Sequence, residues 1–157
     1  MNPARTVTSP SRPPSKGTPA LTVAEPAETA VLRIHRAAGA DPSEPENLLV
    51  LSVDGELDEW TAEAFTARLA ADAGQPEGPD VLLDLGRLYR LDAAGLLALT
   101  EAAAALARLG RRLSLASIRP RVREFLAYSG AEALVPMFPT LELAREHARR
   151  VRGPQTR

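Results

Sequence analysis

Apolar runs that alternate with segments of helical periodicity are the feature that most constrains the fold of this chain. Two runs, NLLVLSVDG at 47–55 and VLLDL at 81–85, are nearly continuous in apolar residues, which is typical of strands covered on both faces. Between them, residues 57–74 place Phe65 and Leu69 on one face of a helix. A strand, helix and strand in this order predict parallel pairing with the helix packed on the sheet.

The boundaries of the expected helices carry residues that commonly start a helix. Asp58 is expected to cap the helix at 57–74, with Glu59 in its first turn. Asp92 is expected to cap a second helix, from about Ala93 to Leu109. Further strands are expected at 30–37, 111–117 and 134–138, and further helices from Pro120 to Gly130 and after Thr140. This order predicts an α/β domain, with a mixed sheet of four to five strands and about four helices packed on it.

Composition divides the chain into three parts. Residues 1–28 are rich in Pro, Ser and Thr and have almost no large apolar side chains, so we expect a disordered N-terminal tail. Residues 29–152 hold all the periodic segments and are expected to form one domain, which is large enough to bury a core. Residues 153–157 are expected to be a disordered C-terminal end.

Motif content gives no support for catalysis or for metal binding. The chain has no cysteine, which excludes disulfides and thiolate metal sites. It also lacks the glycine-rich phosphate loops and the G-x-S-x-G nucleophile elbow. The two histidines, His35 and His147, lie far apart and have no ligand-like neighbours in the sequence. We therefore expect no catalytic residue, no metal and no cofactor.

Charge and hydropathy exclude other partners. The formal net charge is −1, and the local basic group Arg119, Arg121 and Arg123 is small. The single Trp and the two Tyr are too scattered for a base-stacking platform, so we expect no nucleic acid partner. No apolar run approaches the roughly 20 residues of a membrane helix, and no signal-peptide core is present. We expect no membrane association and a cytoplasmic location.

Acidic residues stand near the expected strand ends and helix starts, at Asp54, Asp58, Asp84 and Asp92. In an open α/β sheet such positions can line a crevice that binds a small ligand. Caps and turns are the alternative role for each carboxylate. Both roles remain open at this stage.

Three segments resemble, in the same order, those of one protein family. The strand, G-x-L-D signature and first helix of STAS domains are matched by VLSVDGELDEWTAEAF (50–65). The next strand, and the loop that the family uses as its switch, are matched by VLLDLGRLYRLDAAGLLAL (81–99). The C-terminal helix, short strand and helix are matched by FLAYSGAEALVPMFPTLELAREHA (125–148). Over roughly residues 30–150, the chain looks most like the bacterial anti-sigma factor antagonists.

This resemblance implies a regulatory binding protein rather than an enzyme. Such antagonists bind an anti-sigma factor of the histidine-kinase-like ATPase type and thereby free a sigma factor for transcription. The partner can phosphorylate the antagonist on the third residue of an Asp-Ser-Ser-Gly-like motif at the start of the second helix. The corresponding motif here is Asp92-Ala93-Ala94-Gly95, so the acceptor position is Ala94.

The resemblance therefore implies a docking surface without its phosphate switch. A phosphate at a helix start adds about −1.5 to −2 charge, which can weaken docking, but Ala94 has no hydroxyl to carry it. Gly95 is expected to let a partner approach the backbone closely, and Leu97 is expected to face the partner. The candidate partner-binding residues are Asp58, Asp92, Ala93, Ala94, Gly95 and Leu97.

Two other functions remain open. The missing acceptor fits a STAS-like subunit of another assembly, such as a lipid-transport ATPase complex or a stress-sensing scaffold. The acidic crevice fits a nucleotide or lipid sensor. Other hydroxyl groups could still be phosphorylated, on Thr100, Ser114, Ser117 or Ser129. The sequence gives no oligomeric state.

Overall fold

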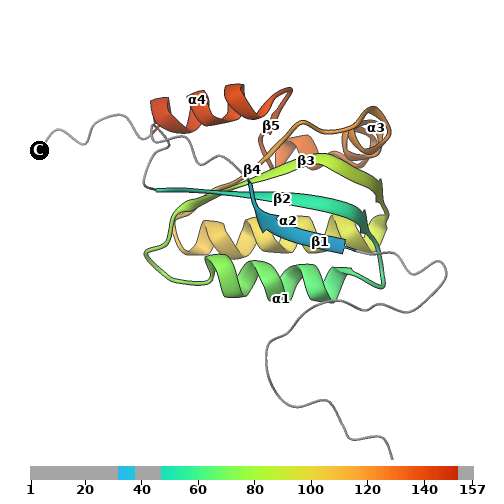
Figure 1. Ribbon diagram of the computed structural model, residues 1–157, viewed down its shortest axis with the longest axis horizontal. Coiled ribbons are helices and arrows are strands. Elements are labelled where there is room, and N and C mark those ends of the chain that lie inside the picture. The colour runs from blue at the N-terminus through green and yellow to red at the C-terminus, as the bar shows by residue number, and fades with distance from the viewer. Residues whose placement is uncertain (1–31, 38–46, 152–157) are drawn as a thin grey trace, which may run out of the picture.

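The chain forms a five-stranded sheet with helices on both of its faces (Figure 1). The computed structural model describes residues 32–37 and 47–151, so the tails expected at 1–28 and 153–157 lie outside the described residues. The elements in chain order are β1 (Leu32–Arg36), β2 (Leu48–Leu57), α1 (Ala62–Ala73), β3 (Asp80–Leu91), α2 (Ala93–Arg108), β4 (Leu113–Ala116), α3 (Pro120–Ser129), the 3-10 turn η1 (Ala131–Ala133), β5 (Met137–Phe138) and α4 (Leu141–Val151). The predicted α/β class and order of elements are confirmed.

The sheet follows the order of the chain, β1-β2-β3-β4-β5. β1 pairs antiparallel to β2, and the other neighbours pair in parallel. Since each parallel crossover advances one strand in the same direction, right-handed crossovers place α1, α2 and α3 on one face. α4 follows β5 and covers the opposite face, above the sheet in Figure 1, whereas α1 and α2 lie below it.

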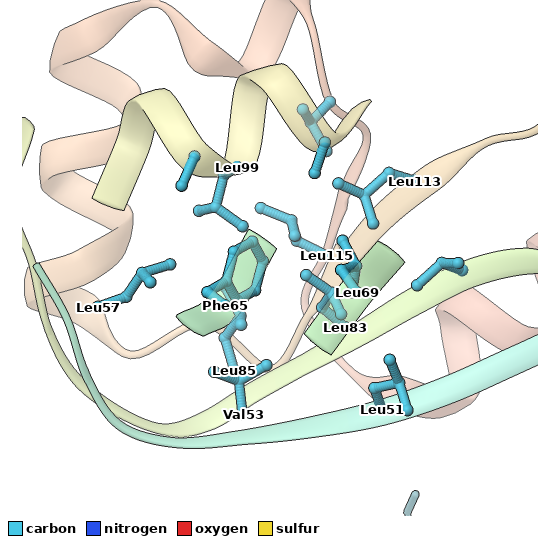
Figure 2. Packing of buried hydrophobic residues seen from close by; sticks show 14 of the residues in the cluster. Leu51, Val53, Leu57, Phe65, Leu69, Leu83, Leu85, Leu99, Leu113 and Leu115 are labelled. Atoms are coloured by element: carbon cyan, nitrogen blue, oxygen red, sulfur yellow. The ribbon is translucent and has the colours of Figure 1, made fainter. Parts of the chain in front are cut away.

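Most buried apolar side chains form one cluster between the sheet and α1, α2 and α3. Phe65 and Leu69 of α1 and Leu99 of α2 point into this cluster and meet residues of the strands (Figure 2). The strand residues labelled there are Leu51, Val53, Leu57, Leu83, Leu85, Leu113 and Leu115. A smaller cluster under α4 consists of Val50, Leu82, Ala116 and Ala144. Burial of one large apolar side chain contributes roughly 1.5–3 kcal/mol, so the larger cluster dominates and fixes α1 and α2.

β3 is longer than the sequence predicted, because it continues past the expected end at residue 85 to Leu91. Two register shifts against β2 each add one residue on the β3 side. The inward-facing residues after the first shift are therefore Leu85, Leu88 and Leu91, spaced by three rather than two. Bulges bend a strand, and β2 and β3 curve toward α2 at this end (Figure 1).

α1 begins later than expected, at Ala62 rather than near residue 57. Asp58 is not its N-cap, since that position belongs to Thr61. Glu59 precedes the helix, and Glu63 takes the expected place in the first turn. The reason is a turn ahead of the helix, in which the Asp58 carboxylate accepts backbone hydrogen bonds from Trp60 and Thr61.

Candidate functional site

The candidate site lies where the β2–α1 loop and the start of α2 meet. β2 and β3 are parallel, so their carboxyl ends share one edge of the sheet, where open α/β sheets commonly bind ligands and partners. Leu57 at the end of β2 is the register partner of Leu91 at the end of β3. The backbone N–H of Asp92 donates to the Leu57 carbonyl at 3.3 Å. The two loops are thereby joined through the backbone.

Asp92 joins the two loops a second time through its side chain. Its Oδ1 accepts from the backbone N–H of Gly95 at 2.9 Å, which confirms the predicted helix cap. Its Oδ2 accepts from the backbone N–H of Glu59 at 3.3 Å. One carboxylate therefore caps α2 and holds the β2–α1 loop against it.

Asp58 lies inside the β2–α1 loop, where its side chain is only 2% exposed. Its Oδ1 accepts from the backbone N–H groups of Trp60 at 2.9 Å and Thr61 at 3.1 Å. The Thr61 hydroxyl accepts from the Asp58 backbone N–H at 3.0 Å and lies 2.9 Å from the Glu56 carbonyl. Asp58 therefore shapes the loop, and its expected place among the partner-binding residues stays a prediction.

Gly95 also has a role in packing inside the domain. It is buried, and a Cβ atom there would lie 2.1 Å from the Leu57 carbonyl oxygen and 2.8 Å from Leu91 Cδ1. The close approach is made by the ends of β2 and β3, and the expected approach of a partner to the Gly95 backbone stays a prediction. Glycine is needed here so that α2 can start against the sheet.

The solvent-facing side of the joined β2–α1 loop and α2 start carries exposed apolar side chains. Ala93 is exposed and Ala94 is partly exposed at the start of α2, and Leu97 one turn later is 57% exposed. Trp60 in the neighbouring loop is 79% exposed. Sequence reasoning did not assign Trp60 to the site; the available signal was the single Trp of the chain, two residues after a turn-forming Asp.

Each of the four acidic residues proposed to line one crevice has a local partner of its own. Asp54 pairs with Arg87 across β2 and β3 at 3.7 Å. Asp84 Oδ1 accepts from the Gly86 backbone N–H at 3.0 Å, within the β3 bulge. Only Asp58 and Asp92 lie at the joined loops, and both carboxylates accept backbone hydrogen bonds there.

The histidines and carboxylates of the described part of the chain do not gather at one point. His35 is exposed on β1, and His147 of α4 packs against the ring of Phe138 with centroids 5.0 Å apart. Within residues 32–37 and 47–151, no group of three or more His, Cys, Asp or Glu side chains could hold a metal ion.

The fold and the paired loops are those of a STAS domain. The STAS domain profile matches residues 40–144, and the chain belongs to this family. Within the family it is an anti-sigma factor antagonist-like domain. It is 32% identical over 99 residues to BtrV of Bordetella bronchiseptica, which is provisionally named an anti-sigma factor antagonist. The match covers 63% of this chain and 84% of BtrV.

Solved structures share the fold. The Bacillus anti-sigma factor antagonist SpoIIAA in its unphosphorylated form superposes with a TM-score of 0.59 at 22% identity, covering 80% of this chain and all of SpoIIAA. The murine anion transporter Slc26a9 superposes with a TM-score of 0.62 at 18% identity, covering 68% of this chain but 18% of the transporter. Among the described helices of this chain, none is long and apolar enough to cross a membrane.

Proposed function

We propose that this chain is a non-enzymatic, cytoplasmic antagonist that binds an anti-sigma factor of the histidine-kinase-like ATPase type and so influences transcription. The family membership and the similarity to BtrV support the regulatory class. The binding surface consists of the start of α2, with Ala93, Ala94 and Leu97 facing outward. Asp58, Asp92 and Gly95 hold that surface in place.

Control by phosphorylation at residue 94 is absent in this proposal. The observation that carries it is Ala94, partly exposed at the start of α2 inside an intact Asp-x-x-Gly frame. The first helical turn leaves backbone N–H groups unpaired and carries partial positive charge. A phosphate there would cover this positive charge with about −1.5 to −2 charge. Without a hydroxyl, residue 94 cannot be phosphorylated. Phosphorylation at this position therefore cannot switch partner binding off.

The charge argument is tested by Ala94→Asp. Purified kinase-type anti-sigma factors from the same genome are titrated one by one by calorimetry with the wild-type chain and the variant. A carboxylate at the interface must be desolvated or repelled, so we expect at least tenfold weaker binding, about 1.4 kcal/mol. Ala127→Asp, on the exposed surface of α3, is the control and should leave the affinity unchanged. Equal affinity for wild type and Ala94→Asp would exclude the start of α2 from the interface.

The Ala94→Ser variant tests whether the absence of a hydroxyl at residue 94 is what prevents phosphorylation. Incubation of this variant with a binding partner and ATP, followed by mass spectrometry, should place one phosphate on the introduced hydroxyl. Because the frame around residue 94 is intact, the hydroxyl alone should restore the reaction. If the wild type is phosphorylated at Thr100 or another hydroxyl and then binds its partner more weakly, the proposed absence of control by phosphorylation is contradicted.

A second candidate is a STAS subunit of a larger assembly, which the fold likeness to part of Slc26a9 favours. The two functions differ in what the full chain binds. Affinity purification at native expression should recover a soluble ATPase partner under the first proposal. Recovery of a transporter or of a large multi-subunit scaffold would favour the second.

A further inference from the structure

We infer that Trp60 is the anchor by which this chain recognises its anti-sigma factor, and that the partner offers an apolar pocket with a basic rim. This inference rests on the proposed function, because it names the chemistry of the partner at the same site. It concerns the β2–α1 loop, outside the switch position on α2. The loop residues Glu59 and Trp60 have no role in capping through their side chains.

The exposure of Trp60 contrasts with the burial of the large side chains that flank its loop. Its side chain is 79% exposed, while Leu57 and Phe65 on either side of the loop are fully buried. Trp has one of the largest apolar surfaces of any side chain, so its burial by a partner would give a large favourable free energy. Trp is among the residues most often found to dominate binding energy when a partner covers them.

The loop presents this indole on a rigid support. The Trp60 backbone N–H donates to the buried Asp58 carboxylate at 2.9 Å, and the preceding N–H of Glu59 donates to Asp92 at 3.3 Å. The N–H groups of two consecutive residues are thus bound by two carboxylates, one from the loop itself and one from the N-cap of α2. A fixed backbone lowers the entropy lost when a side chain is immobilised at an interface. The backbone that carries the indole is therefore already ordered before binding.

The neighbouring surface combines an exposed apolar residue of α2 with exposed acidic residues of the loop and of α1. Leu97, 57% exposed on α2, lies at the same edge because Asp92 ties its helix to the loop. Glu59 in the loop and Glu63 in the first turn of α1 are exposed. Arg90 near the end of β3 lies 3.7 Å from Glu56 in an ion pair. Charge complementarity therefore calls for a partner whose pocket is bordered by Arg or Lys.

The anchor is tested by Trp60→Ala in calorimetric titrations with the anti-sigma factor that binds the wild type. Hot-spot truncations cost about 2 kcal/mol or more, so we expect about 30-fold weaker binding. Trp60→Phe should lose only part of this affinity, because a smaller ring still fills part of the pocket. Tyr128→Ala is the matched control, since Tyr128 is a 95% exposed aromatic residue on α3. Thermal unfolding monitored by circular dichroism verifies that each variant is folded.

The basic rim is tested by Glu59→Lys. This reversal should weaken binding by roughly three- to tenfold and reduce the dependence of the association rate on salt. Glu132→Lys, exposed on η1 of the same protein, is the matched control and should change neither. A Glu59→Lys variant that binds as well as the wild type, with unchanged salt dependence, overturns the charge assignment.

The outcomes separate the two proposals. If no kinase-type anti-sigma factor of the genome binds the wild type, the proposed function fails and the anchor fails with it. If one binds and Trp60→Ala binds equally well, the function stands and the anchor is wrong. If light scattering shows a wild-type dimer that Trp60→Ala separates, while the affinity for the partner is unchanged, a second copy covers the indole and the inference is overturned.

Discussion

Gly95 shows how a single residue ties the candidate site to the fold. Any side chain there meets the Leu57 carbonyl oxygen, since a Cβ would lie 2.1 Å away. The obstacle is backbone, so it cannot move aside as a flexible side chain could. The same glycine stands in the motif implied by the family resemblance, where it was expected to serve a partner. Packing inside the domain already requires a glycine at this position.

Gly95→Ala is therefore expected to destabilise the protein. Alanine favours a helix by about 1 kcal/mol over glycine, but overpacking against a fixed backbone commonly costs about 1–3 kcal/mol or more. We expect a net loss of about 2 kcal/mol in the free energy of unfolding, measured by urea denaturation. Ala93→Ser, on the exposed side of the same helical turn, is the control and should change it by less than about 0.5 kcal/mol. A Gly95→Ala variant as stable as the wild type would contradict the close contact.

Asp92 makes a second residue-scale prediction, because its two oxygens have separate roles. Asp92→Ala removes the acceptors of both the Gly95 and the Glu59 N–H groups and should cost about 1–2 kcal/mol of unfolding free energy. Asp92→Asn keeps one acceptor for the cap and should cost less. Hydrogen exchange of the Glu59 amide should accelerate in both variants, since the amide nitrogen of Asn cannot accept that bond. An unaltered exchange rate would show that the link between the loops is unimportant.

At the scale of elements, hydrophobic spacing predicted the helices better than the strands. Leu99 and Leu106 of α2 are buried as their helical spacing indicates. The second half of β3 was missed because two bulges change the inward spacing from two to three residues. Pairing with β2, which depends on a distant segment, sets those bulges, and no local pattern encodes it. The Asp58 cap was misplaced for a related reason, since Asp and Thr serve turns as well as helix starts.

Arg111 joins three elements at the opposite edge of the sheet. It is buried, and its guanidinium donates to the carbonyls of Ala73 at the end of α1 and of Gln75 and Pro79 in the loop before β3. Its Nε lies 2.7 Å from the Pro79 oxygen. One side chain thus terminates α1 and fixes the entry to β3. An arginine in a polar stretch of the sequence gave no signal of this role.

Arg111→Met is expected to lower the unfolding free energy by about 3 kcal/mol, because it removes the donor to the buried Ala73 carbonyl and to the partly buried carbonyls of Gln75 and Pro79. The adjacent Arg112→Met is the control, since that side chain is exposed and should have little effect. Urea denaturation of both variants measures the difference. Affinity for the partner should be retained by folded Arg111→Met, since the change lies at the far edge of the sheet. Equal stability of the two variants would argue against a role of Arg111 at this junction.

At the scale of the whole molecule, the sheet separates the helices that position the candidate site from α4. The larger cluster joins β2 and β3 to α1 and α2, and therefore sets the geometry of the candidate site. The smaller cluster holds α4 on the opposite face through Ala144. Because the two clusters lie on different faces, stability and binding should be separable. A domain typically has only about 5–15 kcal/mol of net stability. Severe loss of packing in either cluster can therefore unfold the protein.

Ala144→Asp tests this separation. The variant places an unpaired carboxylate at a position that is 3% exposed, against Val50 and Leu82. Burial of that charge is costly, so α4 should detach from the sheet more often. We expect a lower unfolding midpoint and faster hydrogen exchange in α4, with exchange at the start of α2 and the affinity for the anti-sigma factor within about twofold of the wild type. Leu143→Asp introduces the same group at a 47% exposed position on the same helix and should leave all four quantities nearly unchanged. Loss of partner binding in a folded Ala144→Asp protein would place part of the interface on α4, and the binding surface would then extend beyond the joined loops of β2–α1 and α2.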